Sequence, residues 1–113
     1  MKVSAVICAV LLSILGPGDP TSGLDKDSAN QVMQGCRSAL NEKAGDLYLQ
    51  GFCYGVVETL VITRSDICAP NGTSPSQAVR IVVQYIDKRP AQSNDTFFGL
   101  AWQALRTAWP CQH

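Results

Sequence analysis

The stretch "YLQGFCYGVVETL" (residues 48–60) decides how this chain folds, because it places two glycines and a cysteine inside an apolar segment. Gly51 and Gly55 lie two residues to either side of Cys53. A glycine inside a helix costs about 0.5–1 kcal/mol relative to alanine. We therefore interpret the pair as a point where a second helix approaches closely and is tied covalently through Cys53. The alternative is a transmembrane G-x-x-x-G dimer motif, and Glu58 and the polar flanks argue against it.

Apolar periodicity predicts an all-α fold, a small four-helix domain. The segment around Cys53 is rich in β-branched residues and could be a strand, but it is too long for a typical one. Two S-x-x-Q capping boxes, Ser28 with Gln31 and Ser74 with Gln77, mark helix starts. The predicted helices span 28–41, 47–62, 75–88 and 95–108.

Residues 1–23 are expected to be a secretory signal peptide. Lys2 precedes thirteen uncharged residues, "VSAVICAVLLSIL", and a Gly/Pro-rich break, "GPGDPTSG", follows. The expected cleavage point is near Gly23, with Gly16 or Gly18 as alternatives. A retained membrane anchor is the other possibility, but the apolar run is short for a bilayer span. Residues 24–113 would then form a single domain with no membrane association after cleavage.

Four of the five cysteines remain in that domain, and an even number in a short exported chain predicts a disulfide framework. An antiparallel hairpin of the first two helices places Cys36 and Cys53 at nearly the same level. Cys68, before the third helix, is then left for Cys111, after the fourth. Four cysteines allow three connectivities, and we expect Cys36–Cys53 and Cys68–Cys111.

The remaining composition gives no sign of catalysis, a metal site or a cofactor. The sequence has nine Lys/Arg and nine Asp/Glu, one of each before residue 24, and no basic run, so nucleic acid is a poor partner. The cysteines lack the C-x-x-C spacing typical of zinc sites. The only histidine, His113, is the last residue, which makes a Cys–His nucleophile a poor hypothesis. We expect no catalytic residue and no enzyme activity.

The third helix carries two adjoining apolar stripes, a wider arc than one core contact needs. One consists of Val79, Val82, Val83 and Ile86, and the other of Ala78, Ile81 and Tyr85. This pattern predicts a homodimer that uses Ile81 and Tyr85. The alternative is that both stripes belong to the core.

Four segments together resemble the Tai/Rap family of type VI secretion immunity proteins. In chain order they are "SANQVMQGC", "GFCYGVVETL", "ICAPNGTSPSQAVRIVVQYIDKRP" and "LAWQALRTAWPC". They cover nearly the whole domain, including its four cysteines. The resemblance implies an exported α-helical protein of the periplasm of a Gram-negative bacterium, often a homodimer. Such a protein binds and blocks a secreted peptidoglycan amidase that uses a cysteine–histidine pair.

One departure from the family pattern concerns an acidic residue that often follows the second glycine block. Here Glu58 and Thr59 stand near that place. The departure leaves open which effector the protein would bind.

The resemblance further implies inhibition by a protruding loop, and two loops qualify. The favoured one is "KRPAQSND" (88–95), stiffened by Pro90, and the loop before the third helix would make a flanking contact. Ordinary solvated connectors are the alternative for both. The candidate partner-binding residues are Arg89, Gln92, Ser93, Asn94 and Asp95 in the first loop and Asp66, Asn71 and Thr73 in the second.

Two other functions fit a small disulfide-bonded helical protein. One is a periplasmic stress chaperone that exposes apolar surface on acidification, although one histidine and no acidic cluster offer little to drive such a switch. The other is a structural or interaction module without an inhibitory role. A neighbouring gene for a secreted amidase would distinguish these from an immunity protein.

Overall fold

The computed structural model describes residues 28–112, which form an all-α domain, as predicted. The helices are α3 (Ala29–Leu40), α4 (Leu47–Thr63), α5 (Pro75–Asp87), the short 3-10 helix η1 (Pro90–Gln92) and α6 (Phe97–Ala108). Every predicted boundary lies within two residues of the observed one. Within the described part of the chain, extended pairing is limited to one isolated bridge between Ser28 and Thr96. The predicted signal peptide and cleavage site lie outside the described residues.

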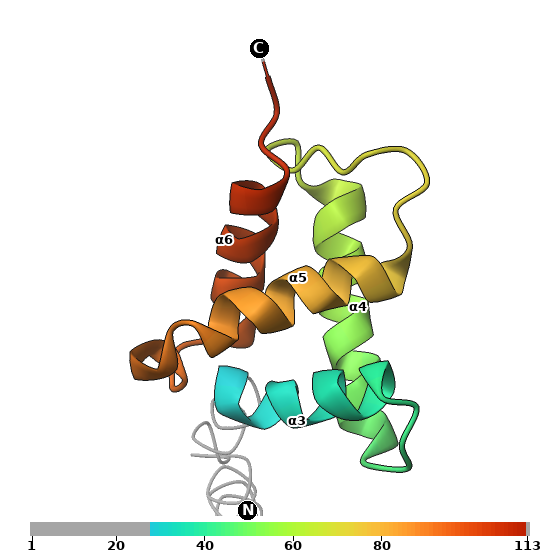
Figure 1. The fold of residues 1–113 in the computed structure, drawn as a ribbon. Helices are drawn as coiled ribbons and strands as arrows, with labels where there is room; N and C mark the ends of the chain where they lie inside the picture. Colours follow the sequence, from blue (N-terminus) through green and yellow to red (C-terminus); the bar gives the residue numbers. More distant parts are fainter. Residues whose placement is uncertain (1–27, 113) are drawn as a thin grey trace, which may run out of the picture.

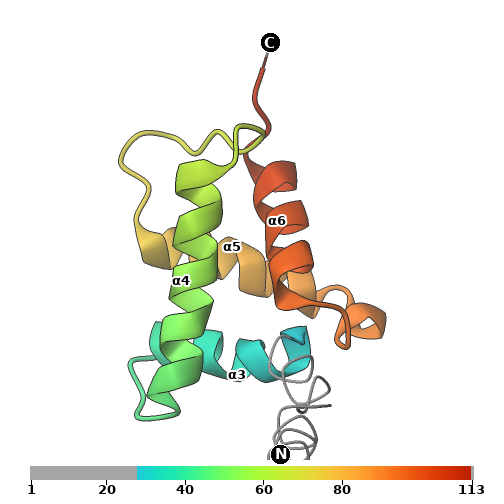
Figure 2. The ribbon, with the colours of Figure 1, turned by 180° about the vertical axis from the view of Figure 1, so that it is seen from behind.

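The four α-helices form a bundle in which each one contacts the other three. In Figure 1, α4 and α6 run side by side, α5 crosses both of them, and α3 lies across one end. Figure 2 shows the same pair from behind, with α5 on the far side. The core between these layers contains Leu60, Phe97 and Leu100, each at most 2% exposed.

The wide apolar arc of α5 is explained by this crossing arrangement. Val79 and Val82 are fully buried, and Ile81 and Tyr85 of the second stripe are half-buried against the same core. A helix that contacts three others needs more than one apolar stripe. The arc therefore gives no independent indication of a dimer.

Both predicted disulfides are present. Cys36–Cys53 joins α3 to α4 with 5.5 Å between the Cα atoms. Cys68–Cys111 joins the loop after α4 to the segment after α6, with a Cα separation of 5.1 Å. By loop-closure entropy they stabilise the fold by on the order of 3 and 4 kcal/mol respectively.

The interpretation of Gly51 and Gly55 is wrong. A Cβ atom built on either meets no atom of another part of the protein within 4 Å. A residue two positions from Cys53 lies about 200° around the helix, so it points away from the disulfide. The close approach is instead at Gly35 of α3, where a Cβ would overlap the carbonyl group of Leu49.

The two predicted capping boxes differ in outcome. At the start of α5, the amide of Gln77 donates to Ser74 Oγ (3.2 Å) and the Ser74 amide donates to Gln77 Oε1 (2.8 Å). At the start of α3, the Ser28 side chain makes no capping hydrogen bond. The amides of Ala29 and Asn30 donate to backbone carbonyls in the 93–95 segment, so tertiary contact replaces the local cap.

Candidate partner-binding surfaces

The connection 88–95 projects beyond the packed helices at the C-terminal end of α5 (Figure 1). Backbone hydrogen bonds within the connection and from the start of α3 hold it in place. The Gln92 amide donates to Arg89 O and the Asp95 amide to Gln92 O, each at 2.9 Å. The carbonyls of Ser93 and Asp95 accept from the start of α3 at 2.9 and 2.8 Å. The connection is therefore a fixed protrusion whose tip carries the 3-10 helix.

The five candidate side chains of this connection are not equally available. Arg89 donates from its guanidinium to Tyr85 O at 2.9 Å and lies 3.5 Å from the centre of the Tyr85 ring. Gln92 and Ser93 are half-buried, whereas Asn94 and Asp95 are exposed. Asn94 and Asp95 line a shallow hollow of about 450 Å³ beside α6. Asn94 and Asp95 are thus the candidates most accessible to a partner.

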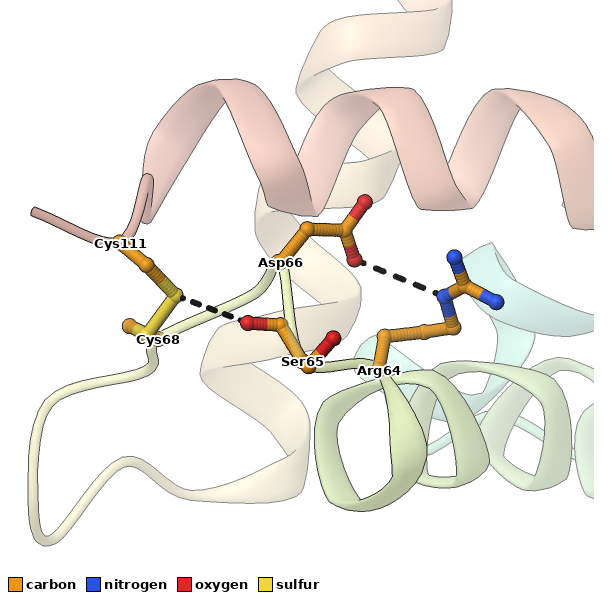
Figure 3. The surroundings of a disulfide bond; sticks show 5 residues. All are labelled: Arg64, Ser65, Asp66, Cys68 and Cys111. Atoms are coloured by element: carbon orange, nitrogen blue, oxygen red, sulfur yellow. Dashed lines mark hydrogen bonds and ion pairs between the residues drawn. A yellow bond between two sulfur atoms is a disulfide. The ribbon is translucent and has the colours of Figure 1, made fainter. Parts of the chain in front are cut away.

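In the other loop, Asp66 is committed to the fold. Its Oδ2 accepts a 2.9 Å hydrogen bond from Trp102 Nε1, and its Oδ1 lies 3.5 Å from Arg64 Nε. Figure 3 shows the Arg64 side chain turned toward this carboxylate. Burial acts to raise the pKa of Asp66, but the Trp102 hydrogen bond and the Arg64 charge outweigh it and hold that pKa below its ordinary value. Asp66 therefore joins the end of α4 to α6.

The same loop is fastened to the C-terminal segment by contacts around the second disulfide. Cys111 Sγ lies 3.3 Å from the carbonyl oxygen of Ser65, and the Cys68 amide donates to Trp109 O at 2.9 Å (Figure 3 shows the disulfide and Ser65). Further along, Gly72 has a φ of 86°, a backbone conformation that favours glycine. The loop has a rigid base and a turn at Gly72.

Asn71 and Thr73 lie at that turn. Asn71 is exposed, and Thr73 donates its hydroxyl to Pro70 O at 2.6 Å. Both line a hollow of about 480 Å³ shared with α5 and Trp109. Sequence reasoning missed its α5 members, Gln77, Arg80 and Gln84, although their spacing along one helix face could have indicated it.

The two loops lie at opposite ends of α5 (Figures 1 and 2). The thirteen residues of α5 separate them by about 20 Å, at 1.5 Å per residue. The structure thus does not bring the two sets of candidate residues together. A partner would have to extend along α5 to contact both.

A further surface is the solvent face of α4, which carries several large apolar side chains together with the exposed Glu58 and Thr59. Leu47, Tyr48 and Ile62 are 78%, 63% and 79% exposed, and Phe98 of α6 is 49% exposed. Phe98 lines a hollow with Phe52 and Val56 of α4, so it borders the same helix. Gly51 and Gly55, with open space above them, lie in this face.

Two further observations concern the kind of site the domain can hold. Within residues 28–112, no three His, Cys, Asp or Glu side chains are grouped closely enough to hold a metal ion. None of the helices in this range is both long and apolar enough to cross a membrane.

Comparison with known proteins gives one clear relationship. The sequence model of one protein family, the Rap1a immunity proteins, matches residues 28–111. This range contains the four α-helices of the described part of the chain and the four disulfide-bonded cysteines. No curated protein and no solved structure matches the chain. Since the match covers most of the sequence, the chain belongs to the Rap1a family of immunity proteins.

Proposed function

We propose that this protein is a periplasmic immunity protein that binds a type VI secreted peptidoglycan amidase and occludes its active site. Membership of the Rap1a family supports a role against a secreted effector. Two disulfides support an oxidising compartment, because such bonds are rare in the cytosol. In this proposal the protein acts by binding alone and performs no chemistry.

The observation that carries the occlusion proposal is the fixed protrusion at 88–95. A loop that is ordered before binding loses little conformational entropy on association. The backbone bonds from this connection to the start of α3 supply that order. We assign the main contacts to Asn94 and Asp95, whose side chains are exposed, with Arg89, Gln92 and Ser93 supporting them from half-buried positions. Asn71 and Thr73 would make the flanking contact.

The first test is whether a neighbouring gene encodes a secreted amidase, and the second is whether this protein inhibits that amidase. The double variant Asn94→Ala/Asp95→Ala is expected to weaken inhibition at least tenfold, since interface hot spots contribute about 2 kcal/mol or more. The matched control is Gln34→Ala/Lys43→Ala, which removes two exposed side chains elsewhere on the surface. Equal inhibition by both variants would remove the 88–95 connection from the interface. No inhibition by the unaltered protein would contradict the proposed function itself.

We also propose that the protein is a homodimer, and that its contact is the solvent face of α4. Ile81 and Tyr85 are poorer candidates than first expected, because both are half-buried and Tyr85 also bonds Gln103 through its hydroxyl. On α4, Tyr48 and Ile62 lie seven residues to either side of Gly55. An antiparallel copy centred on Gly55 therefore brings each Tyr48 opposite the partner's Ile62, and the glycines permit close approach. The same register places Glu58 opposite Phe52, so the carboxylate must lie at the solvent edge of the contact.

Sedimentation of two variants tests this assignment. Ile62→Glu places a charge in the α4 face and should give a monomer at micromolar concentration. Gln84→Glu is the control, because Gln84 is exposed on α5 beside Ile81 and Tyr85. A monomeric unaltered protein would refute the dimer. If Gln84→Glu dissociated the dimer and Ile62→Glu did not, the dimer contact would lie on α5 instead of α4.

A further inference from the structure

The hollow between the 70–73 loop, α5 and Trp109, called here the loop–α5 hollow, has the composition of a ligand site. It is a shallow hollow of about 480 Å³ that is open to solvent, and most of its lining residues are exposed. It lies at the opposite end of α5 from the 88–95 connection, although two of its lining residues, Asn71 and Thr73, also belong to the proposed flanking contact with the amidase.

A single cation, Arg80, lines the loop–α5 hollow, and no carboxylate does. Within residues 28–112 the ion pairs are Arg37–Asp87 and Arg64–Asp66, which leaves the exposed Arg80 guanidinium without an ionic partner. A guanidinium binds carboxylates through two parallel hydrogen bonds. The electrostatics of the hollow therefore favour a ligand with one carboxylate.

Three amide side chains line the hollow together with Arg80. Gln77 uses its Oε1 to cap α5, which leaves its NH₂ group able to donate into the hollow. Asn71 and Gln84 are exposed and, within residues 28–112, make no side-chain hydrogen bond. Amides present both donors and acceptors. They match hydroxyl groups, which also donate and accept.

The larger apolar side chains of the lining are held in place. Ile81 is half-buried against the core, and Trp109 is half-buried beside Cys111. The Cys68 amide binds Trp109 O, and the second disulfide closes the loop at its base. The apolar wall at Trp109 is therefore fixed before binding, which lowers the entropy lost in ordering that wall. Aromatic and aliphatic side chains can pack against the C–H face of a sugar ring.

We propose that the loop–α5 hollow binds a sugar that carries a carboxylate. In this site Arg80 pairs with the carboxylate, the amides of Asn71, Gln77 and Gln84 bond the hydroxyl or acetamido groups, and Ile81 and Trp109 pack against the ring. An extended peptide fits less well, because within residues 28–112 the hollow offers no sheet edge to pair its backbone.

The test is a titration of the oxidised, ¹⁵N-labelled protein with two sugars that differ by one group. N-acetylmuramic acid carries a lactyl carboxylate, and N-acetylglucosamine lacks it. The acid is expected to shift the amide signals of residues 70–84 and the Trp109 indole, with a Kd on the order of millimolar. The neutral sugar should bind at least about tenfold more weakly, because it cannot form the charge-assisted bond to Arg80.

Two variants identify the source of that preference. Arg80→Gln should abolish the difference between the two sugars. Lys88→Gln is the matched control, since it removes the same charge from an exposed position just after α5 and outside the hollow. If both variants lost the preference for the acidic sugar equally, the preference would come from general electrostatic attraction, and the proposal would be overturned. It would also be overturned by equal binding of the two sugars, stronger shifts with an acidic tripeptide, or no shift at about 20 mM acid.

Discussion

Substituting Gly35 by alanine should destabilise the domain, because α4 leaves no room for a methyl group there. The new Cβ would overlap the Leu49 carbonyl and lie 2.6 Å from the Gln50 amide nitrogen. These are backbone atoms, so no side chain can rotate aside. The adjacent residue, Cys36, is bonded to Cys53, which keeps α3 from moving away.

The magnitude follows from two opposing effects. Overpacking costs about 1–3 kcal/mol, and the backbone contact puts this site at the upper end of that range. Alanine recovers about 0.5–1 kcal/mol of helix propensity. The free energy of unfolding should therefore fall by about 2 kcal/mol, which lowers the Tm of a domain this size by roughly 8–16 °C.

Gly51→Ala and Gly55→Ala are matched controls, since they add the same methyl group to α4 where there is open space. Each should raise the free energy of unfolding by about 0.5–1 kcal/mol. The assay is thermal unfolding by circular dichroism with the disulfides intact, at a concentration low enough to keep all variants monomeric. The reasoning about close approach would be refuted if Gly35→Ala left the free energy of unfolding unchanged. It would also be refuted if Gly51→Ala lowered that free energy as much as Gly35→Ala does.

Three other outcomes are expected. Alkylation and mass spectrometry during titration with dithiothreitol should find the exposed Cys68–Cys111 bond reduced before the fully buried one between α3 and α4, because exchange needs access to a sulfur; simultaneous reduction would contradict this. The pKa of Asp66 is lowered in the folded state, so its carboxylate stabilises the domain above its unfolded pKa near 3.8 and this contribution is lost as the pH falls through the folded pKa. The Asp66→Asn variant should accordingly have a lower free energy of unfolding than the unaltered protein at pH 7, and it should lose less of that free energy on acidification. If the two proteins lost the same amount on acidification, the Asp66 carboxylate would not stabilise the fold. Ser74→Ala should cost about 1 kcal/mol in urea unfolding through loss of the α5 cap, and an unaffected midpoint would show that the capping box is dispensable.

The sequence by itself determined the elements and their covalent links. Apolar periodicity and turn residues are local signals, and they placed all four helices within two residues. The disulfide pairing also followed, because a short hairpin fixes the level of Cys36 against Cys53. The capping box at Ser74 is likewise local, since both of its hydrogen bonds form within four residues.

Only the tertiary structure decided which faces of those helices meet. The sequence indicated a close helix contact but placed it at Gly51 and Gly55, whereas the rotation of α4 that buries Cys53 turns both toward solvent and leaves Gly35 at the contact. The apolar arc of α5 looked like a surface until three neighbouring helices accounted for it. Asp66 looked like a free loop carboxylate, but Trp102, 36 residues away, binds it. Helix rotation and contacts distant in sequence depend on the packing of the whole core, which no local pattern records.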